Sequence, residues 1–142
     1  MKKFELTSET KAFFGKTLYR IRALISFGDV SAGDLGGFVE KEENLDQSGD
    51  AWVYGNARVS GDAWVDKIGA IFWVGAVGSR NDTTTFFKCK DGKVRVTCGC
   101  FFGDLTEFAE KVNETHGDNE HGKVYMLAIE MAKARISLEG ER

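Results

Sequence analysis

A repeat of six residues in the middle of the chain restricts the possible folds more than any other feature of the sequence. Its consecutive copies read Gly-Asp-Ala-Trp-Val-Tyr (49–54), Gly-Asn-Ala-Arg-Val-Ser (55–60) and Gly-Asp-Ala-Trp-Val-Asp (61–66). A degenerate copy, Glu-Asn-Leu-Asp-Gln-Ser, precedes them at 43–48. This period fits neither an α-helix nor a simple alternating strand. It is typical of a β-helix in which each hexapeptide makes one short strand and one corner.

The repeat also predicts which side chains lie inside the coil. In each copy the alanine and the valine are two residues apart, so both point inward, and the residue between them points outward. The outward residues are Trp52, Arg58 and Trp64. Glycine followed by Asp or Asn suits the corners, where a positive φ is needed, and ten of the 17 glycines fall between Gly28 and Gly78.

With three hexapeptides to a coil, residues 18 apart stack on one another. Val53 then lies between Leu35 and Ile71, and Leu45 lies against Ala63, so these rows are apolar. We therefore predict an α+β protein. It has a short left-handed β-helix, a hexapeptide solenoid of about two to three coils, followed by a β-hairpin and two α-helices.

This organisation divides the chain into three segments. They are an N-terminal capping segment at 1–32, the solenoid at 33–78 and a ββαα C-terminal module at 79–142. So short a stack needs caps on both ends, and residues 17–27 read as a strand that caps one of them.

Residues 83–101 read as a β-hairpin, because Asp91-Gly92 is a strong signal for a two-residue turn. That turn pairs Lys88 with Arg95 and Phe86 with Thr97. One face of the hairpin then carries apolar and thiol side chains, on which the helices pack: Phe87, Cys89, Val94, Val96, Cys98 and Cys100. The opposite face carries a basic patch with one aromatic side chain: Lys88, Lys90, Lys93, Arg95 and Phe86.

Two amphipathic helices complete the predicted module. The first begins at the candidate N-cap Asp104, with Glu107 three residues later, and ends at Gly117. Its apolar stripe is Leu105, Phe108, Ala109 and Val112. The stripe predicted for the second helix is Val124, Leu127, Ala128, Met131 and Ala132.

Two parts of the chain resemble a known family. The run from Gly33 to Leu45, leading into the Gly-Asp-Ala-Trp-Val-Tyr copies, resembles phage and prophage hexapeptide-repeat proteins, the polymer-forming β-solenoids. The tail, with Cys98-Gly99-Cys100-Phe101 and residues 115–121, resembles a module that follows such solenoids. The resemblance implies a phage or prophage origin and no single activity.

Charge is distributed in blocks along the chain. Residues 1–27 hold six basic and two acidic side chains (+4), and residues 28–66 hold two basic and nine acidic ones (-7). Residues 83–101 carry +3. Such alternation predicts that the blocks dock on one another or steer a partner.

The sequence also predicts where the protein resides. Three cysteines, an odd number, favour a reducing compartment over a disulfide framework. The N-terminus has no secretory h-region, and no apolar run approaches the roughly 18 residues that span a bilayer. We expect a cytoplasmic protein, in the host cell if it is phage-encoded, with no membrane partner.

Two sets of residues are candidates for binding. The basic patch, Lys88, Lys90, Lys93 and Arg95 with Phe86, suits a phosphate-bearing ligand, an acidic protein surface or, less favourably, a nucleic acid. It also suits a solvated face or internal docking on the acidic solenoid. The second set is Trp52 and Trp64, which mark either a contact between subunits or domains, or burial under the N-terminal arm or the C-terminal helices.

Catalysis and metal binding have weaker support. His116, Asp118, Glu120 and His121 gather in one connection, where helix-end chemistry is favoured over a general base. Cys98 and Cys100 with these histidines allow a zinc site, but buried core thiols are favoured, so we predict no metal and no cofactor. Many hexapeptide solenoids are acyltransferases with a histidine base beside the coils, whereas residues 28–78 contain no histidine.

These observations favour a non-enzymatic phage or prophage accessory protein that self-associates and binds. Its partner is a host protein, including a component of antiviral defence, or a small phosphate-bearing ligand. The alternatives are a hexapeptide-type acyltransferase-like enzyme that uses His116 or His121, and a structural, virion-associated solenoid module.

Overall fold

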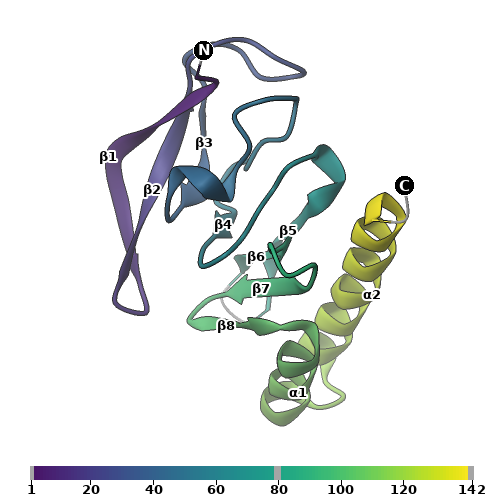
Figure 1. The fold of residues 1–142 in the computed structure, drawn as a ribbon. Coiled ribbons are helices and arrows are strands. Elements are labelled where there is room, and N and C mark those ends of the chain that lie inside the picture. Colours follow the sequence, from purple (N-terminus) through teal and green to yellow (C-terminus); the bar gives the residue numbers. More distant parts are fainter. Residues whose placement is uncertain (1, 79–80, 141–142) are drawn as a thin grey trace.

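The computed structural model describes residues 2–78 and 81–140. Eight strands form two four-stranded sheets, and two α-helices follow them, which confirms the α+β class (Figure 1). In chain order the strands are β1 (Phe4–Phe13), β2 (Lys16–Ala23), β3 (Leu35–Val39), β4 (Arg58–Val59), β5 (Ile71–Val77), β6 (Asp82–Lys88), β7 (Val94–Cys98) and β8 (Phe101–Asp104). The helices are α1 (Leu105–His116) and α2 (Glu120–Gly140), and two short 3-10 turns are η1 (Glu42–Asn44) and η2 (Ile68–Ala70).

The first sheet joins the N-terminal arm to the repeats. Strands β1 and β2 form an antiparallel hairpin, β2 pairs antiparallel with β3, and β3 pairs parallel with β4. The predicted capping strand at 17–27 corresponds to β2. The sequence patterns did not predict β1, which is largely exposed on one edge of this sheet.

In the repeats, the corner residues and the inward-pointing residues are those that the sequence predicts. The corner glycines Gly49, Gly55 and Gly61, six residues apart, all have positive φ, at 73°, 55° and 64°. The alanine and valine of every copy are fully buried in one core: Ala51, Val53, Ala57, Val59, Ala63 and Val65.

The predicted stacking interval is wrong by two residues. Val39 pairs with Val59, and Leu45 forms a parallel bridge with Val65, so partners lie 20 residues apart instead of 18. Both intervals exceed three hexapeptides, and the turn η1 lies within only the first of them, between Val39 and Val59. Ile71, predicted to stack on Val53, belongs to β5 and pairs with Phe87 of β6 in the second sheet.

The second sheet is covered on both faces. Strands β5 to β8 follow one another as antiparallel neighbours (Figure 1). Ile71 and Phe87 on one face join the core of the repeats, whereas Phe86 and Val96 on the other face join a core with the helices. The predicted boundary between the solenoid and the C-terminal module stays a prediction, and residue 79 lies outside the described part of the chain.

The predicted hairpin register is wrong by one residue. Lys88 pairs with Val94 and Phe86 with Val96, because the connection spans the five residues 89–93 rather than a two-residue turn. The Cys89 and Lys93 backbones hydrogen-bond within this connection at 2.9 Å. A shift of one residue moves side chains to the other face of a strand, so Lys88 and Arg95 lie on opposite faces.

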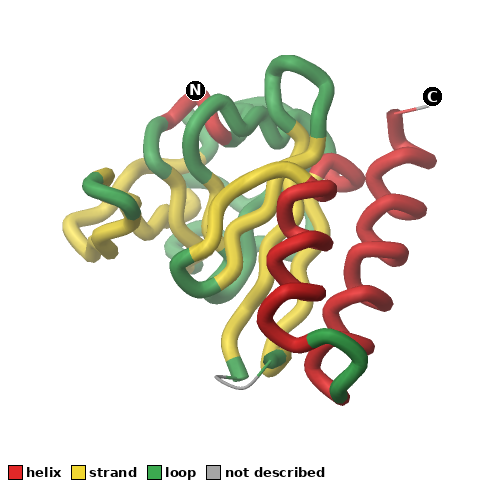
Figure 2. Tube along the Cα trace, turned by 90° about the horizontal axis from the view of Figure 1, so that it is seen from below, coloured by secondary structure: helices red, strands yellow, loops and turns green. Residues whose placement is uncertain are grey.

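The helices pack side by side over the second sheet (Figure 2). The N-cap prediction for α1 is confirmed: Asp104 accepts from the Glu107 N–H at 2.8 Å, and Glu107 accepts from the Asp104 N–H at 2.9 Å. Gly117 follows the last residue of α1, with φ at 60°. The stripe predicted for α2 is wrong in part, because Val124, Leu127 and Met131 are exposed. Among residues 120–136 of that helix, the buried hydrophobic side chains are Tyr125, Ala128, Ile129, Ala132 and Ile136.

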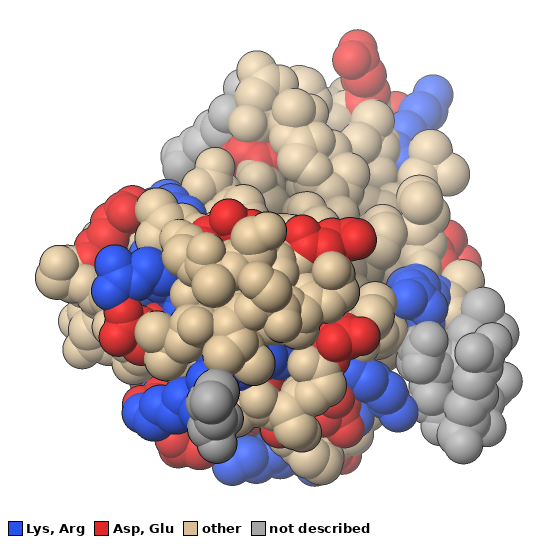
Figure 3. Space-filling view, turned by 90° about the horizontal axis from the view of Figure 1, so that it is seen from above, with Lys and Arg blue, Asp and Glu red and all other residues tan. Residues whose placement is uncertain are grey.

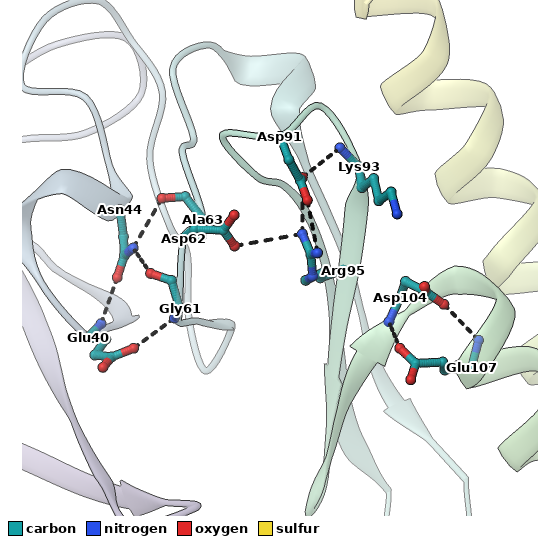
Figure 4. A network of polar contacts seen from close by, with 10 residues as sticks. All are labelled: Glu40, Asn44, Gly61, Asp62, Ala63, Asp91, Lys93, Arg95, Asp104 and Glu107. Atoms are coloured by element: carbon teal, nitrogen blue, oxygen red, sulfur yellow. Dashed lines mark hydrogen bonds and ion pairs between the residues drawn. The ribbon is translucent and has the colours of Figure 1, made fainter.

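Asn44 holds two layers of the repeat region together from inside (Figure 4). Its fully buried side chain accepts from the N–H groups of Glu40 and Lys41, at 3.0 and 3.1 Å. It donates to the carbonyl oxygens of Gly61 and Ala63, both at 3.1 Å. The buried amide thus satisfies four backbone groups from two segments of the repeat region.

Replacing this amide tests its structural role. We expect Asn44→Ala to lower the free energy of unfolding by about 3 kcal/mol, because buried backbone groups lose their partners. Urea denaturation measures the change. Asn113→Ala on the exposed surface of α1 is the matched control and should stay within about 0.5 kcal/mol of the parent. Equal midpoints for the two variants would contradict this role.

Candidate functional site

A cavity of about 240 Å³ lies between the second sheet and the two helices. It brings together thiol, imidazole, phenol, amine and carboxylate groups beside an apolar wall. The residues that line it are Asp82, Cys98, Gly99, Cys100, Phe101, Phe108, Lys111, Val112, Thr115, His116 and Tyr125. A concave site with apolar walls and a few converging polar groups is the usual form of a small-molecule site.

A chain of polar contacts runs through this cavity. The Thr84 hydroxyl donates to the Cys98 Sγ at 3.3 Å, and that thiol donates to the Tyr125 hydroxyl at 3.7 Å. The His116 ring stacks on the Tyr125 ring, with centroids 5.7 Å apart. The His121 ring lies 5.6 Å from His116. The stacked ring of Tyr125 therefore holds the imidazole of His116, and the cavity can present it to a ligand.

The junction between the helices places His116 there. His116 is the last residue of α1, and the N–H of the next residue, Gly117, bonds to the Asn113 carbonyl at 2.9 Å. Gly122 in the first turn of α2 has no room for a Cβ, which would collide with the Gly117 carbonyl oxygen. This close approach brings Tyr125 beside His116.

A second cavity, of about 330 Å³, adjoins the first. The two share Asp82, Gly99 and Cys100, and the second extends to Phe13 of the N-terminal hairpin and Arg58 of the repeats. The Arg58 guanidinium donates to the Gly99 carbonyl at 3.0 Å and lies 5.1 Å from the Phe13 ring centroid. The exposed Cys100 thus borders both cavities, one beside the helices and one between the N-terminal hairpin and Arg58 of the repeats.

The cysteines do not converge on a metal. Cys89 is buried in the core of the repeats, whereas Cys98 packs against the core under the helices. Within residues 2–78 and 81–140, no three His, Cys, Asp or Glu side chains lie close enough to hold a metal ion.

The predicted basic patch does not form as one surface. Phe86, predicted to be outward, is fully buried and packs on Phe108. Lys88 pairs with Asp66 at 2.9 Å and lies 4.8 Å from the Trp64 ring centroid. The register explains this change, because it turns Phe86 toward the helices. Lys90 and Lys93 are exposed.

Arg95 also pairs within the chain. It contacts Asp91 at 2.9 Å and Asp62 of the last repeat at 3.6 Å (Figure 4). The hydrogen bond from Arg95, with a second one from the Lys93 N–H, lowers the pKa of Asp91 to about 2. The predicted partners of this patch stay untested.

The two predicted tryptophans have different environments. Trp52 is 3% exposed beneath the N-terminal segments, with edge contacts to Phe4 and Phe27. Burial under the N-terminal arm is one of the alternatives that the sequence allowed for Trp52. Trp64 is 40% exposed, beside Lys88. Trp64 is therefore accessible to another molecule, whereas Trp52 is not.

The charge blocks dock on one another. Lys2 pairs with Glu42 at 3.1 Å and Lys16 with Glu40 at 3.7 Å, so the basic N-terminal segment meets the acidic repeats. The basic residues of β6 and β7 meet the same acidic segment from the other side. Figure 3 shows the result on one face, where positive and negative side chains are interspersed.

Comparison with known proteins gives one partial likeness. No family model matches the chain. The chain is similar to the uncharacterized acetyltransferase YdcK of Escherichia coli (strain K12), with 34% identity over 77 residues. The match covers 44% of this chain and 24% of that protein, so the chain spans less than a quarter of its relative's length. No described helix is both long and apolar enough to cross a membrane.

The site makes a first prediction about thiol reactivity. Burial raises the pKa of Cys89 to about 12, and this thiol is 1% exposed, whereas Cys100 is exposed. We expect a disulfide reagent to modify Cys100 first in the native protein and Cys89 only after unfolding, because the thiolate is the reactive form. Mass spectrometry of timed samples gives the order, and Cys100→Ser should remove the fast phase. Early labelling of Cys89 would refute the arrangement.

The Arg95 contacts make a second prediction. Asp91 has a lower pKa when folded than its ordinary 3.8, so its charge stabilises the fold above about pH 4, and this contribution is lost as pH falls through about 2. Asp91→Asn should therefore melt below the parent at pH 7, and the difference should vanish near pH 2. Thermal melts across this range measure it. Asp118→Asn, at an exposed position, should match the parent throughout.

Proposed function

We propose that this chain is an acyl-transfer protein whose acceptor substrate binds in the cavity of His116. The observation that carries the proposal is the His116 imidazole, held against Tyr125 in a cavity of about 240 Å³. The partial likeness to a protein named as an acetyltransferase supports the same class of reaction. The acyltransferase alternative also requires a histidine base, for which His116 and His121 are the candidates.

The cavity residues suit the steps of acyl transfer. The His116 imidazole removes a proton from an acceptor hydroxyl or amine as that group attacks the thioester carbonyl of an acyl donor. The new bond joins the acceptor oxygen or nitrogen to the acyl carbon, the carbon–sulfur bond breaks, and the proton passes to the departing thiolate. Phe101 and Phe108 give apolar contact to the acyl group, and Lys111 places positive charge on the cavity wall for a phosphate-bearing donor.

The repeats support the proposal at the level of fold. We propose that residues 35–66 form a short left-handed β-helix, as the six-residue spacing of corner glycines and the parallel β3–β4 pairing suggest. In this arrangement the second cavity, with Arg58, places the repeats against the donor. Both cavities meet at Cys100.

One observation favours a second function, binding without catalysis. Lys111 gives the cavity a positive charge for a phosphate group whether or not His116 acts as a base, and the Cys98 thiol, bonded to Thr84 and Tyr125, forms part of its wall. The same cavity then retains a phosphate-bearing ligand. The phage origin and the action on host defence stay predictions, which neither the fold nor the relative tests.

Replacing each of the two histidines in turn distinguishes acyl transfer from binding without catalysis. With acetyl-CoA and a panel of small amines and alcohols, we expect release of free thiol to fall about 100-fold or more in His116→Gln, because the general base is lost. His121→Gln is the matched control, since His121 lies outside the cavity lining, and it should keep the activity. Thiol release is followed with a chromogenic disulfide.

The outcomes are distinct. Equal loss in both histidine variants, or turnover unchanged in His116→Gln, would refute the role of His116. Tight binding of acetyl-CoA by the parent with no turnover on any acceptor would support the binding function instead. Lys111→Glu should weaken donor affinity under either function.

A further inference from the structure

Helix α2 carries a second apolar stripe that faces away from the core. Val124, Leu127 and Met131 are 37%, 66% and 59% exposed, whereas the neighbouring Ala128 and Ile129 are buried. The exposed residues are three and four positions apart, so they share one side of the helix. A surface helix normally has one apolar side, and a second one marks a contact surface.

The stripe is open to another molecule. In both Figure 1 and Figure 2, α2 forms an outer border of the protein, with α1 and the second sheet on its inner side. Met126, 42% exposed, adds to the apolar surface on the same helix.

We propose that this stripe binds α2 of a second copy of the chain, with the two helices antiparallel. A two-fold axis near Leu127 places this residue against Leu127 of the partner subunit. Val124 then lies opposite Met131 of the partner subunit, and the reverse contact forms by symmetry. A surface that is complementary to itself in this way is what a two-fold dimer requires.

The charges beside the stripe select the antiparallel arrangement. Lys123 and Glu130 lie on the same flank of the helix, about equally far from Leu127 in opposite directions. An antiparallel pair sets Lys123 against Glu130 of the partner subunit, twice in each dimer. In a parallel pair these two residues would lie on opposite sides of the interface from their copies, so Lys123 and Glu130 could not pair with each other. Glu130 contacts Lys133 at 3.3 Å in one copy, but both side chains are more than half exposed, so this pair exchanges at little cost.

Light scattering across a range of protein concentrations tests the proposal. We expect the full chain to be a dimer at tens of micromolar, and Leu127→Glu to be a monomer throughout. Because Leu127 is exposed, this variant should keep the parent's circular dichroism spectrum. Glu110→Lys, an exposed charge change on α1, is the matched control and should remain a dimer.

Charge reversal tests the orientation. Lys123→Glu should weaken the dimer roughly tenfold or more, since it sets two acidic pairs across the axis. The double variant Lys123→Glu, Glu130→Lys restores opposite charges and should restore the affinity. A parent that is a monomer at every concentration, or a dimer that Leu127→Glu leaves intact, would overturn the interface. Failure of the double variant to recover would overturn the antiparallel pairing. These measurements detect assembly only, so their outcome does not depend on the result of the acyl-transfer assay.

Discussion

The second sheet packs against the repeats on one face and against the helices on the other. The rest of the structure depends on this constraint. Phe87 and Ile71 enter the core of the repeats, and Phe86 and Val96 enter the core of the helices. A sheet buried on both sides cannot keep charged side chains in its centre without partners. Lys88 and Arg95 satisfy this condition by reaching acidic residues at the corners of the repeats. The same sheet joins two cores, and the cavity lies at its border with the helices.

Regular periodicity made the repeats predictable. The spacing of Gly49, Gly55 and Gly61 identified the corners, and the Ala and Val of each copy identified the inside, because one short unit recurs with the same geometry. The stacking interval failed because a spacing of six residues does not by itself fix which rows pair: Val39 pairs with Val59, and Leu45 with Val65. The hairpin register failed at Asp91-Gly92, because a local turn signal does not fix where the ladder begins. A two-sided sheet also lacks the polar and apolar alternation that would have corrected the error.

The candidate site was predictable only in pieces. Cys98, Cys100 and His116 attracted attention as reactive residue types, but Lys111 and Tyr125 had no motif around them. They join the site because two helices meet at Gly117 and Gly122, which is a tertiary contact without a sequence spacing of its own. On α2, apolar residues occupy two sides of the helix, so periodicity offered two possible stripes. Packing against the sheet decides between them, and the pattern alone assigned Leu127 and Met131 to the wrong side.

The outward-pointing residue of each hexapeptide contacts a different part of the protein. Trp52 lies under the N-terminal segments, Arg58 reaches the second sheet, and Trp64 lies by Lys88. In the proposed β-helix, insertion of one further hexapeptide before Arg58 would rotate the following repeats to another side of the coil and carry the second sheet away from the N-terminal hairpin. Insertion of a whole coil would preserve their relative direction and only lengthen the distance between them. In that arrangement, the contacts of the outward residues favour growth of the chain by complete turns over growth by single repeats.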